Sequence, residues 1–392
     1  MVLALLVFLL RDGRHDVDPQ TIEAPRASPA AAAAALASFV DGVRSRDAAV
    51  LAGLAPPQSP VARDLMEGIG HNADALDLRG LSARFVDQAG MVEADGSWTG
   101  IVELTWQLGS LDPGPSEADV AVSFAPAGDA LGIVGFSATA RARAPLWLRG
   151  ELAIARAKRV LVLVDGPQAD ADAVRRRVVR GIGVVERVLP DRISSVVVEV
   201  PANAADLDET LGAEPGTYAG IAAVTAFAGT STSDDAPVHV FVNPELTTGL
   251  SRAGAQVVMS HELVHIATEA TRTPVEPWLL EGFADYVALR DTNLPDSTTL
   301  GRAIELVRRE GIPDTLPGAA DFGTRARDLQ ASYELAWLAC RLIAEQLGER
   351  GLVSVHDAIR SGAPVAEAMV RAGLSLRELT PLWRAHMDQL TR

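Results

Sequence analysis

The segment Gln256-Val-Val-Met-Ser-His-Glu-Leu-Val-His-Ile-Ala267 decides how this chain is interpreted. His261 and His265 are four residues apart, so they lie on one face of a helix and both imidazoles can reach one zinc ion at about 2.0 to 2.1 Å. Glu262 points about 100° away from His261. It is therefore placed to contact a water on the metal rather than the metal itself, which is the position a general base requires.

The segment 261–265 alone is also compatible with two ordinary helix histidines that bind no metal. A third ligand would distinguish a metal site from that alternative. The segment Pro277-Trp-Leu-Leu-Glu-Gly-Phe-Ala-Asp-Tyr286 predicts a second apolar helix. Glu281 and Asp285 share one side of it because they are four residues apart. Glu281 can complete a site of two histidines and one glutamate. Asp285 can accept the outer N–H of a ligating imidazole and so fix its tautomer.

Two other carboxylates are candidates for the third ligand. Glu269 lies two turns from His261 on the same predicted helix. A ligand there is too far along the axis to share one tetrahedral ion with both histidines. Glu276 precedes Pro277 on a predicted loop, from which its side chain can swing toward the metal, so it stays an alternative to Glu281.

The two motifs together resemble the gluzincins, the thermolysin-like branch of the zincin metallopeptidases in the peptidase MA superfamily, in their W-x-x-E-G-x-A-D/E-Y version. The resemblance covers about residues 238–351 and implies a zinc metallopeptidase. A metzincin would carry a glycine and a histidine where Thr268 and Thr271 stand, so that class is excluded. The resemblance implies that His261, His265 and Glu281 are the zinc ligands. It also implies that Glu262 is the general base and that the carboxylate of Asp285 is hydrogen-bonded to His261.

A transition-state partner is also expected, because a peptide carbonyl under attack develops an oxyanion that the metal alone stabilises incompletely. In related gluzincins a tyrosine or histidine from a later helix serves. Tyr333 opens a predicted helix that ends near Gly348 and looks like that helix, although Leu347 stands where the family has a second tyrosine. Tyr333 either stabilises the oxyanion or has a packing or capping role. We expect His356 and His386 to be ordinary surface or core residues with no role in the site.

An edge strand beside the metal helix is expected to pair with extended substrate, as it does in zincins. Residues 222–226 and 238–243 are both candidates for this strand. The sequence does not choose between them, and it assigns His239 no role.

The rest of the chain predicts an α+β fold. Helical patterns at 29–54 and 60–66 precede about four alternating strands, near 81–87, 102–108, 120–124 and 131–138. This order resembles the cone of the nuclear-transport-factor-2-like fold. A hinge near 144–147 is expected to separate a cone-like domain, 29–148, from a gluzincin-like metallopeptidase domain, 149–392, strand-rich over 149–250 and helical over 251–392.

Composition excludes several classes of protein. The 35 basic and 51 acidic residues give a net charge of −16, which repels phosphate backbones, so no nucleic-acid partner is expected. The 48% hydrophobic content predicts a folded chain. Cys340 is the single cysteine, so a metal must be held by His, Asp or Glu. Lys158 is the single lysine, an arginine bias typical of GC-rich genomes such as those of actinobacteria.

The apolar run Met1–Leu10 is closed by Arg11. Ten helical residues rise about 15 Å, half of a bilayer core of about 30 Å. We interpret residues 1–10 as a truncated membrane anchor or signal remnant and 11–28 as a tether, with a buried first strand or helix as the alternative. These features predict an extracytoplasmic protein, membrane-anchored or secreted.

The leading functional hypothesis is a zinc-dependent peptidase acting on peptide or protein substrates, with Glu262 as general base. One alternative is a catalytically degenerate zincin that acts as a binding or assembly protein at the cell surface. Another is a latent protease whose cleft is occluded by residues 30–148.

Overall fold

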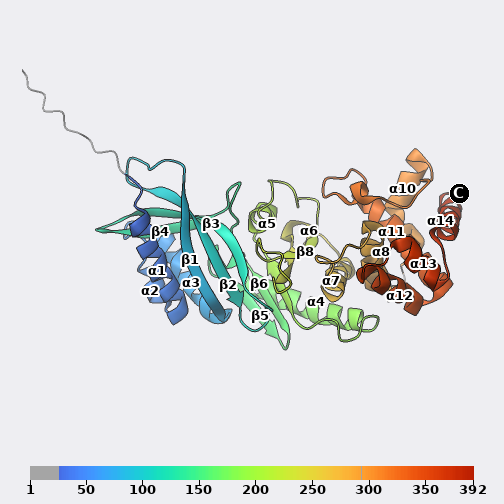
Figure 1. The fold of residues 1–392 in the computed structure, drawn as a ribbon, viewed down its shortest axis with the longest axis horizontal. Helices are drawn as coiled ribbons and strands as arrows, with labels where there is room; N and C mark the ends of the chain where they lie inside the picture. The colour runs from blue at the N-terminus through green and yellow to red at the C-terminus, as the bar shows by residue number, and fades with distance from the viewer. Residues whose placement is uncertain (1–25, 293) are drawn as a thin grey trace, which may run out of the picture.

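The computed structural model describes residues 26–292 and 294–392 of the 392-residue chain. Within these residues the fold is α+β, as predicted, with fourteen α-helices, a four-stranded antiparallel sheet and a five-stranded mixed sheet. Figure 1 shows an N-terminal helix and sheet region, a central sheet region and a C-terminal helical region in succession along the long axis. The proposed anchor at 1–10 lies outside the described residues. No helix in the described part is both long and apolar enough to cross a membrane.

The N-terminal region places three helices against an antiparallel meander. Strand order follows the sequence, and every second residue of β2 is buried, which explains the alternation in its sequence. The single helix expected at 29–54 is two helices, because Arg46 adopts a left-handed backbone (φ 56°) and Asp47 caps a new start. The elements are α1 (Pro29–Ser45), α2 (Ala48–Ala52), α3 (Pro60–Ala75), β1 (Leu78–Ala89), β2 (Trp98–Leu108), β3 (Ser116–Ala127) and β4 (Ala130–Ser137).

The central sheet has the order β5-β6-β7-β9-β8. Strands β6, β7 and β9 are parallel, whereas β5 and β8 run antiparallel at the two edges. The apolar runs of β6 and β7 are buried along their whole length, as expected of strands covered on both faces. The elements are β5 (Ala153–Ala157), β6 (Val160–Val164), α4 (Gln168–Glu186), β7 (Val196–Val200), α5 (Ala204–Leu211), β8 (Ala223–Phe227) and β9 (Val238–Val242).

The two faces of the central sheet pack against different regions. Val162 and Val198 face α4 and the helix that carries the two histidines. Leu161 and Leu163, on the opposite face, join the core of the N-terminal region. The expected hinge is a buried 3₁₀ turn, η1 (Leu146–Leu148), in that same core. The connection is therefore packed, and a domain boundary at residue 148 stays a prediction.

The C-terminal region is helical, as expected from residue 251 onward. Two of its helices carry the two motifs: α7 packs against β8 and β9 of the central sheet, and α8 lies between α7 and α11. The elements are α6 (Pro244–Thr247), α7 (Arg252–Thr268), α8 (Pro277–Leu289), α9 (Asp296–Thr299), α10 (Gly301–Glu310), η2 (Ala319–Phe322), α11 (Leu329–Leu347), α12 (Glu349–Arg360), α13 (Val365–Ala372) and α14 (Leu376–Thr391).

Candidate metal centre

Helix α7 presents both histidines to α8. The Ser251 side chain caps its start by accepting a hydrogen bond from the Gly254 N–H at 3.1 Å. Leu263 and Val264 are buried in the core beneath the central sheet, which fixes the rotation of the helix. His261 and His265 consequently project from the other side, and their rings lie 4.7 Å apart, edge to face. The local spacing in the sequence accounts for this pair.

Helix α8 brings Glu281 to the histidines because it crosses α11 very closely. A Cβ atom on Gly282 would lie 2.3 Å from the Ala336 carbonyl oxygen, so glycine is required at this crossing. Pro277 occupies the first turn of α8, where its missing N–H costs nothing. The glycine next to Glu281 thus sets the distance between the metal motif and α11.

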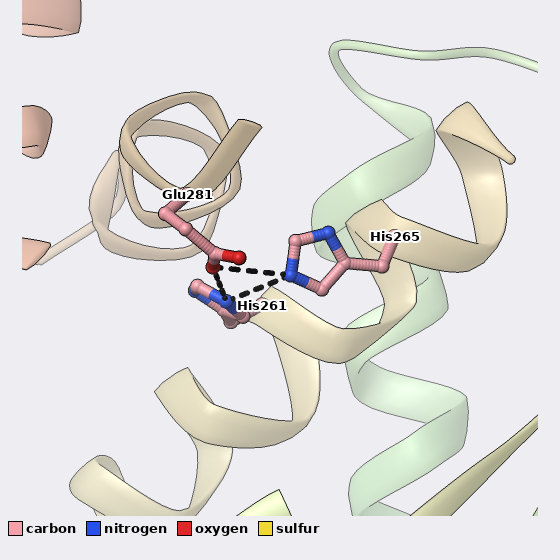
Figure 2. A group of neighbouring side chains, drawn as sticks. All are labelled: His261, His265 and Glu281. Atoms are coloured by element: carbon pink, nitrogen blue, oxygen red, sulfur yellow. Dashed lines mark hydrogen bonds and ion pairs between the residues drawn. The ribbon is translucent and has the colours of Figure 1, made fainter. Parts of the chain in front are cut away.

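The three expected ligand atoms converge (Figure 2). His261 Nε2 lies 3.0 Å from His265 Nε2 and 3.1 Å from Glu281 Oε2, and His265 Nε2 lies 3.3 Å from Glu281 Oε2. Two ligands of a tetrahedral zinc ion with bonds of about 2.0 to 2.1 Å are about 3.3 Å apart. The donor set, two imidazoles and one carboxylate, is one that zinc prefers. The residues therefore fit a zinc ion in both chemistry and spacing.

Asp285 lies behind His261. Its Oδ1 is 2.7 Å from His261 Nδ1, the contact expected of a carboxylate that orients a ligating imidazole. The Nδ1 atom of His265, by contrast, is buried and has no hydrogen-bond partner among the described residues. The two ligands are thus held unequally, His261 by a hydrogen bond and His265 by packing.

Electrostatics at the centre favour a bound cation. Burial by itself would lower the pKa of the His261 imidazolium, but the carboxylates of Asp285 and Glu281 raise it well above the ordinary value. Burial would raise the pKa of Glu281, yet His265 and His261 lower it strongly. The cluster attracts positive charge, and a metal ion can take the place of a proton there.

Glu262 enters the same cavity from α7. It is only 5% exposed, and its Oε2 accepts a hydrogen bond from Thr225 Oγ1 at 2.7 Å. Thr225 belongs to β8, so the sheet edge itself positions this carboxylate. The sequence analysis missed Thr225, because no local pattern connects a strand residue to a helix 37 positions later.

Tyr333 lies on the opposite wall, on α11. Its ring centroid is 6.0 Å from that of His261. Burial is the main cause that raises the pKa of the Tyr333 phenol, and the negative charges of Glu281 and Glu262 raise it further. The phenol therefore keeps its proton and can donate a hydrogen bond. This placement agrees with the expected transition-state partner and does not test that role.

Two cavities of about 210 Å³ and 150 Å³ meet at the centre. Both are lined by Ile221, Ala223 and Tyr333, besides His261 and Glu262. Among the described residues that line them there is no arginine or lysine, and none comes from the N-terminal 30–148 segment. The cleft is therefore open and predominantly neutral apart from its own carboxylates.

The other candidates of the sequence lie elsewhere. Glu269 pairs with Arg360, and the exposed Glu276 precedes α8; neither joins the ligand group. His356 is stacked on Phe283 in the core, where burial lowers its pKa to about 4.

Tyr286, His386 and His239 also lie outside the ligand group. Tyr286 packs against the α8–α11 core. His386 contacts Arg341. His239, which the sequence left without a role, is buried between Asp112 and Glu199.

No protein-family model matches the chain, and no curated protein matches it.

Proposed function

We propose that this protein is a zinc-dependent peptidase of the gluzincin type. The observation that carries the proposal is the convergence of His261, His265 and Glu281 on one point beside the buried carboxylate of Glu262. A metal-storage or structural site has no need of a carboxylate next to the ligands that is not itself a ligand. The support for catalysis is thus the carboxylate of Glu262, which is not one of the three converging side chains, and its contact with Thr225.

A zinc ion held by these residues would supply Lewis acidity, which polarises a peptide carbonyl and makes a water molecule acidic near neutral pH. Glu262 is placed to take a proton from that water and to pass it to the departing amine. Asp285 holds the His261 ring in one tautomer through Nδ1. Tyr333 keeps its phenolic proton and can donate it as a hydrogen bond to an oxyanion.

The edge strand supports a peptide as substrate. Ala222 and Ala228 bond to the neighbouring strand β9 through Asn243 and Pro237. Backbone bonding alternates along an antiparallel ladder, so Ala223, Thr225 and Phe227 direct their N–H and C=O groups to the free edge. An extended peptide can add to this edge as a further strand. Of the two strands considered from the sequence, β8 is the edge and β9 is interior.

The test is zinc analysis combined with cleavage of an unbiased peptide library. Wild-type protein should bind one zinc ion and cleave peptides. The Glu262→Gln variant should bind zinc equally and lose about 10² to 10⁴ in rate, because it lacks a positioned base. Glu276→Gln makes the same change at an exposed glutamate near the site and should leave zinc and rate unchanged.

Two outcomes contradict the proposal. Protein that binds no zinc when supplied with it lacks the metal centre. Glu262→Gln protein that cleaves as fast as wild type does not use this base. Zinc binding without turnover in the full wild-type chain would instead favour the degenerate binding protein or the latent protease.

A further inference from the structure

The free edge of β8 ends at an arginine from the N-terminal region. Arg143 Nη1 donates hydrogen bonds to the carbonyl oxygens of Gly229 at 2.8 Å and Phe227 at 3.4 Å. Its stem lies against Gly212 at the end of α5, where a Cβ atom would be 2.7 Å from Arg143 Cγ and the backbone is left-handed (φ 64°). Arg143 is thus held on both sides at the end of the strand.

Within residues 26–292 and 294–392, no ion pair joins Arg143 to a carboxylate. The hydrogen bonds that its guanidinium donates go to two backbone carbonyls, those of Phe227 and Gly229. The side chain is half-buried, and burial lowers its pKa, opposed in part by Tyr218. Arginine nevertheless stays protonated in proteins. In a chain of net charge −16, this leaves a positive group at a place where an anionic ligand gains a charge-assisted hydrogen bond.

Arg143 lies in a groove next to the proposed active-site cleft. It lines a cavity of about 380 Å³ together with Phe227 and Thr230. This cavity shares Tyr218, Val224, Thr225 and Thr271 with the cavity at the metal centre. The two spaces are therefore adjacent to each other along the edge of β8.

The register of the strand sets the distance along this groove. Thr225 contacts Glu262, and Phe227, whose carbonyl Arg143 binds, is two residues further along β8. Two residues of strand span about 7 Å. A peptide paired with the free edge would thus bring a residue two to three positions from the cleaved bond next to Arg143.

We propose that Arg143 binds a carboxylate of the substrate peptide two to three residues from the cleaved bond and so selects for it. The carboxylate is either an Asp or Glu side chain or the C-terminus of the substrate. The proposal rests on the proposed peptidase function and adds to it a substrate class. It also gives the N-terminal region a part in recognition, because Arg143 follows β4.

The experiment uses the full zinc-loaded chain and pairs of peptides that differ only in Asp or Asn at one position, scanned across the cleaved bond. A second set has a free or an amidated C-terminus, which separates the two sources of carboxylate. Wild-type protein should cleave the acidic member about tenfold faster, by kcat/KM, at one position only. Arg143→Gln should remove this preference and still cleave neutral peptides. Arg143→Lys should keep the preference, because the charge remains.

The matched control is Arg141→Gln. Arg141 is exposed and lies two residues away, so this change removes the same charge from the same segment outside the groove. It should leave the preference intact. Equal loss in both variants would assign the effect to general charge and overturn the proposal.

The remaining outcomes separate this proposal from the peptidase function. Wild-type protein that cleaves neutral and acidic peptides equally at every position overturns the role of Arg143 and leaves the peptidase intact. This comparison needs no variant, so it holds even if Arg143→Gln unfolds. Protein that binds zinc but cleaves nothing contradicts an active peptidase and favours the latent protease or the binding protein. In that case, the binding of labelled peptide pairs tests whether Arg143 binds a carboxylate. Tighter binding of the acidic peptide by wild type, but not by Arg143→Gln, supports this role. Equal binding of both peptides by wild type contradicts it.

Discussion

Two histidines in this protein are each flanked by two carboxylates, yet their surroundings differ. His239 is 1% exposed, with Glu199 Oε1 2.6 Å from Nδ1 and Asp112 Oδ1 2.9 Å from Nε2. Both of its ring nitrogens face an acceptor, so both carry a proton. Burial by itself would lower the pKa of His239, but the two carboxylates raise it to about 10.

His261 is likewise flanked by two carboxylates, but its surroundings differ from those of His239. Asp285 and Glu281 flank its ring, but a second imidazole, His265, shares Glu281 and the group opens on two cavities. The three side chains of the His239 cluster are all buried, with exposed fractions of 1% for His239, 4% for Asp112 and 6% for Glu199. The buried His239 cluster is therefore an ion cluster within the fold, whereas the His261 group, with a third donor and access from two cavities, is a candidate metal site.

The largest expected effect removes the metal. His261→Gln deletes one of three ligands and the contact with Asp285, so zinc content should fall close to zero and peptide cleavage to background. Urea unfolding checks that the variant is folded, because His265 is buried and His261 and Glu281 are partly buried. Zinc analysis and a cleavage assay measure the first effect. Retained zinc would show that the ligand set is wrong.

The second prediction concerns the buried His239 cluster. His239→Gln leaves Asp112 and Glu199 buried without a cation, which should cost about 3–5 kcal/mol of the free energy of unfolding. Zinc content and the cleavage rate should stay normal at temperatures where the variant is folded. Urea unfolding at neutral pH measures the loss. A His239→Gln variant that is as stable as wild type but binds no zinc would contradict this prediction. It would show that His239, and not the His261 group, is needed for the metal.

The third prediction is the pH dependence of stability. The pKa of His239 is about 10 in the folded chain and about 6.5 when unfolded. The folded state therefore holds an extra proton between these values. The stabilisation is complete below about pH 6.5 and is lost as the pH rises through 10. Wild-type stability should fall by a few kcal/mol over this window, with a shallower slope in His239→Gln. Equal slopes would mean that His239 is not the titrating group.

The smallest effect concerns the residue behind the metal. Asp285→Asn keeps the size of the side chain but weakens the acceptor for His261 Nδ1, so zinc affinity should fall about 10- to 100-fold. Competition with a chelator measures it. Asp291→Asn, at a surface aspartate paired with Arg187, is the control and should leave affinity unchanged. An unchanged affinity in Asp285→Asn would show that this contact does not tune the metal.

Much of the metal centre was predictable because it depends on local geometry. The spacing of His261 and His265 fixes both on one helix face, and that of Glu281 and Asp285 does the same on the next helix. The alternation in β2 likewise predicted a sheet with one buried face. The short helix α5 and the edge strand β5 were not predicted, since α5 has only eight residues and the alanine-rich sequence of β5 has little β-propensity.

Contacts between residues far apart in the sequence could not be predicted from such local patterns. Thr225 meets Glu262 because β8 is the sheet edge beside α7. Asp112 meets His239 across 127 residues because the loop after β2 lies against the central sheet. Arg143 reaches the end of β8 from the N-terminal region.

The sequence by itself determined the composition of the candidate site: two histidines, three carboxylates, no thiolate partner and an acidic chain. The tertiary structure decided which histidine is fully buried and which lines a cavity, what contacts Glu262, and where a positive charge lies near the cleft. The physical reason is the range of the interactions. Helix and strand periodicity is set by neighbours within a few residues, whereas burial, access and contacts between distant carboxylates and histidines depend on strand order and on how whole regions pack.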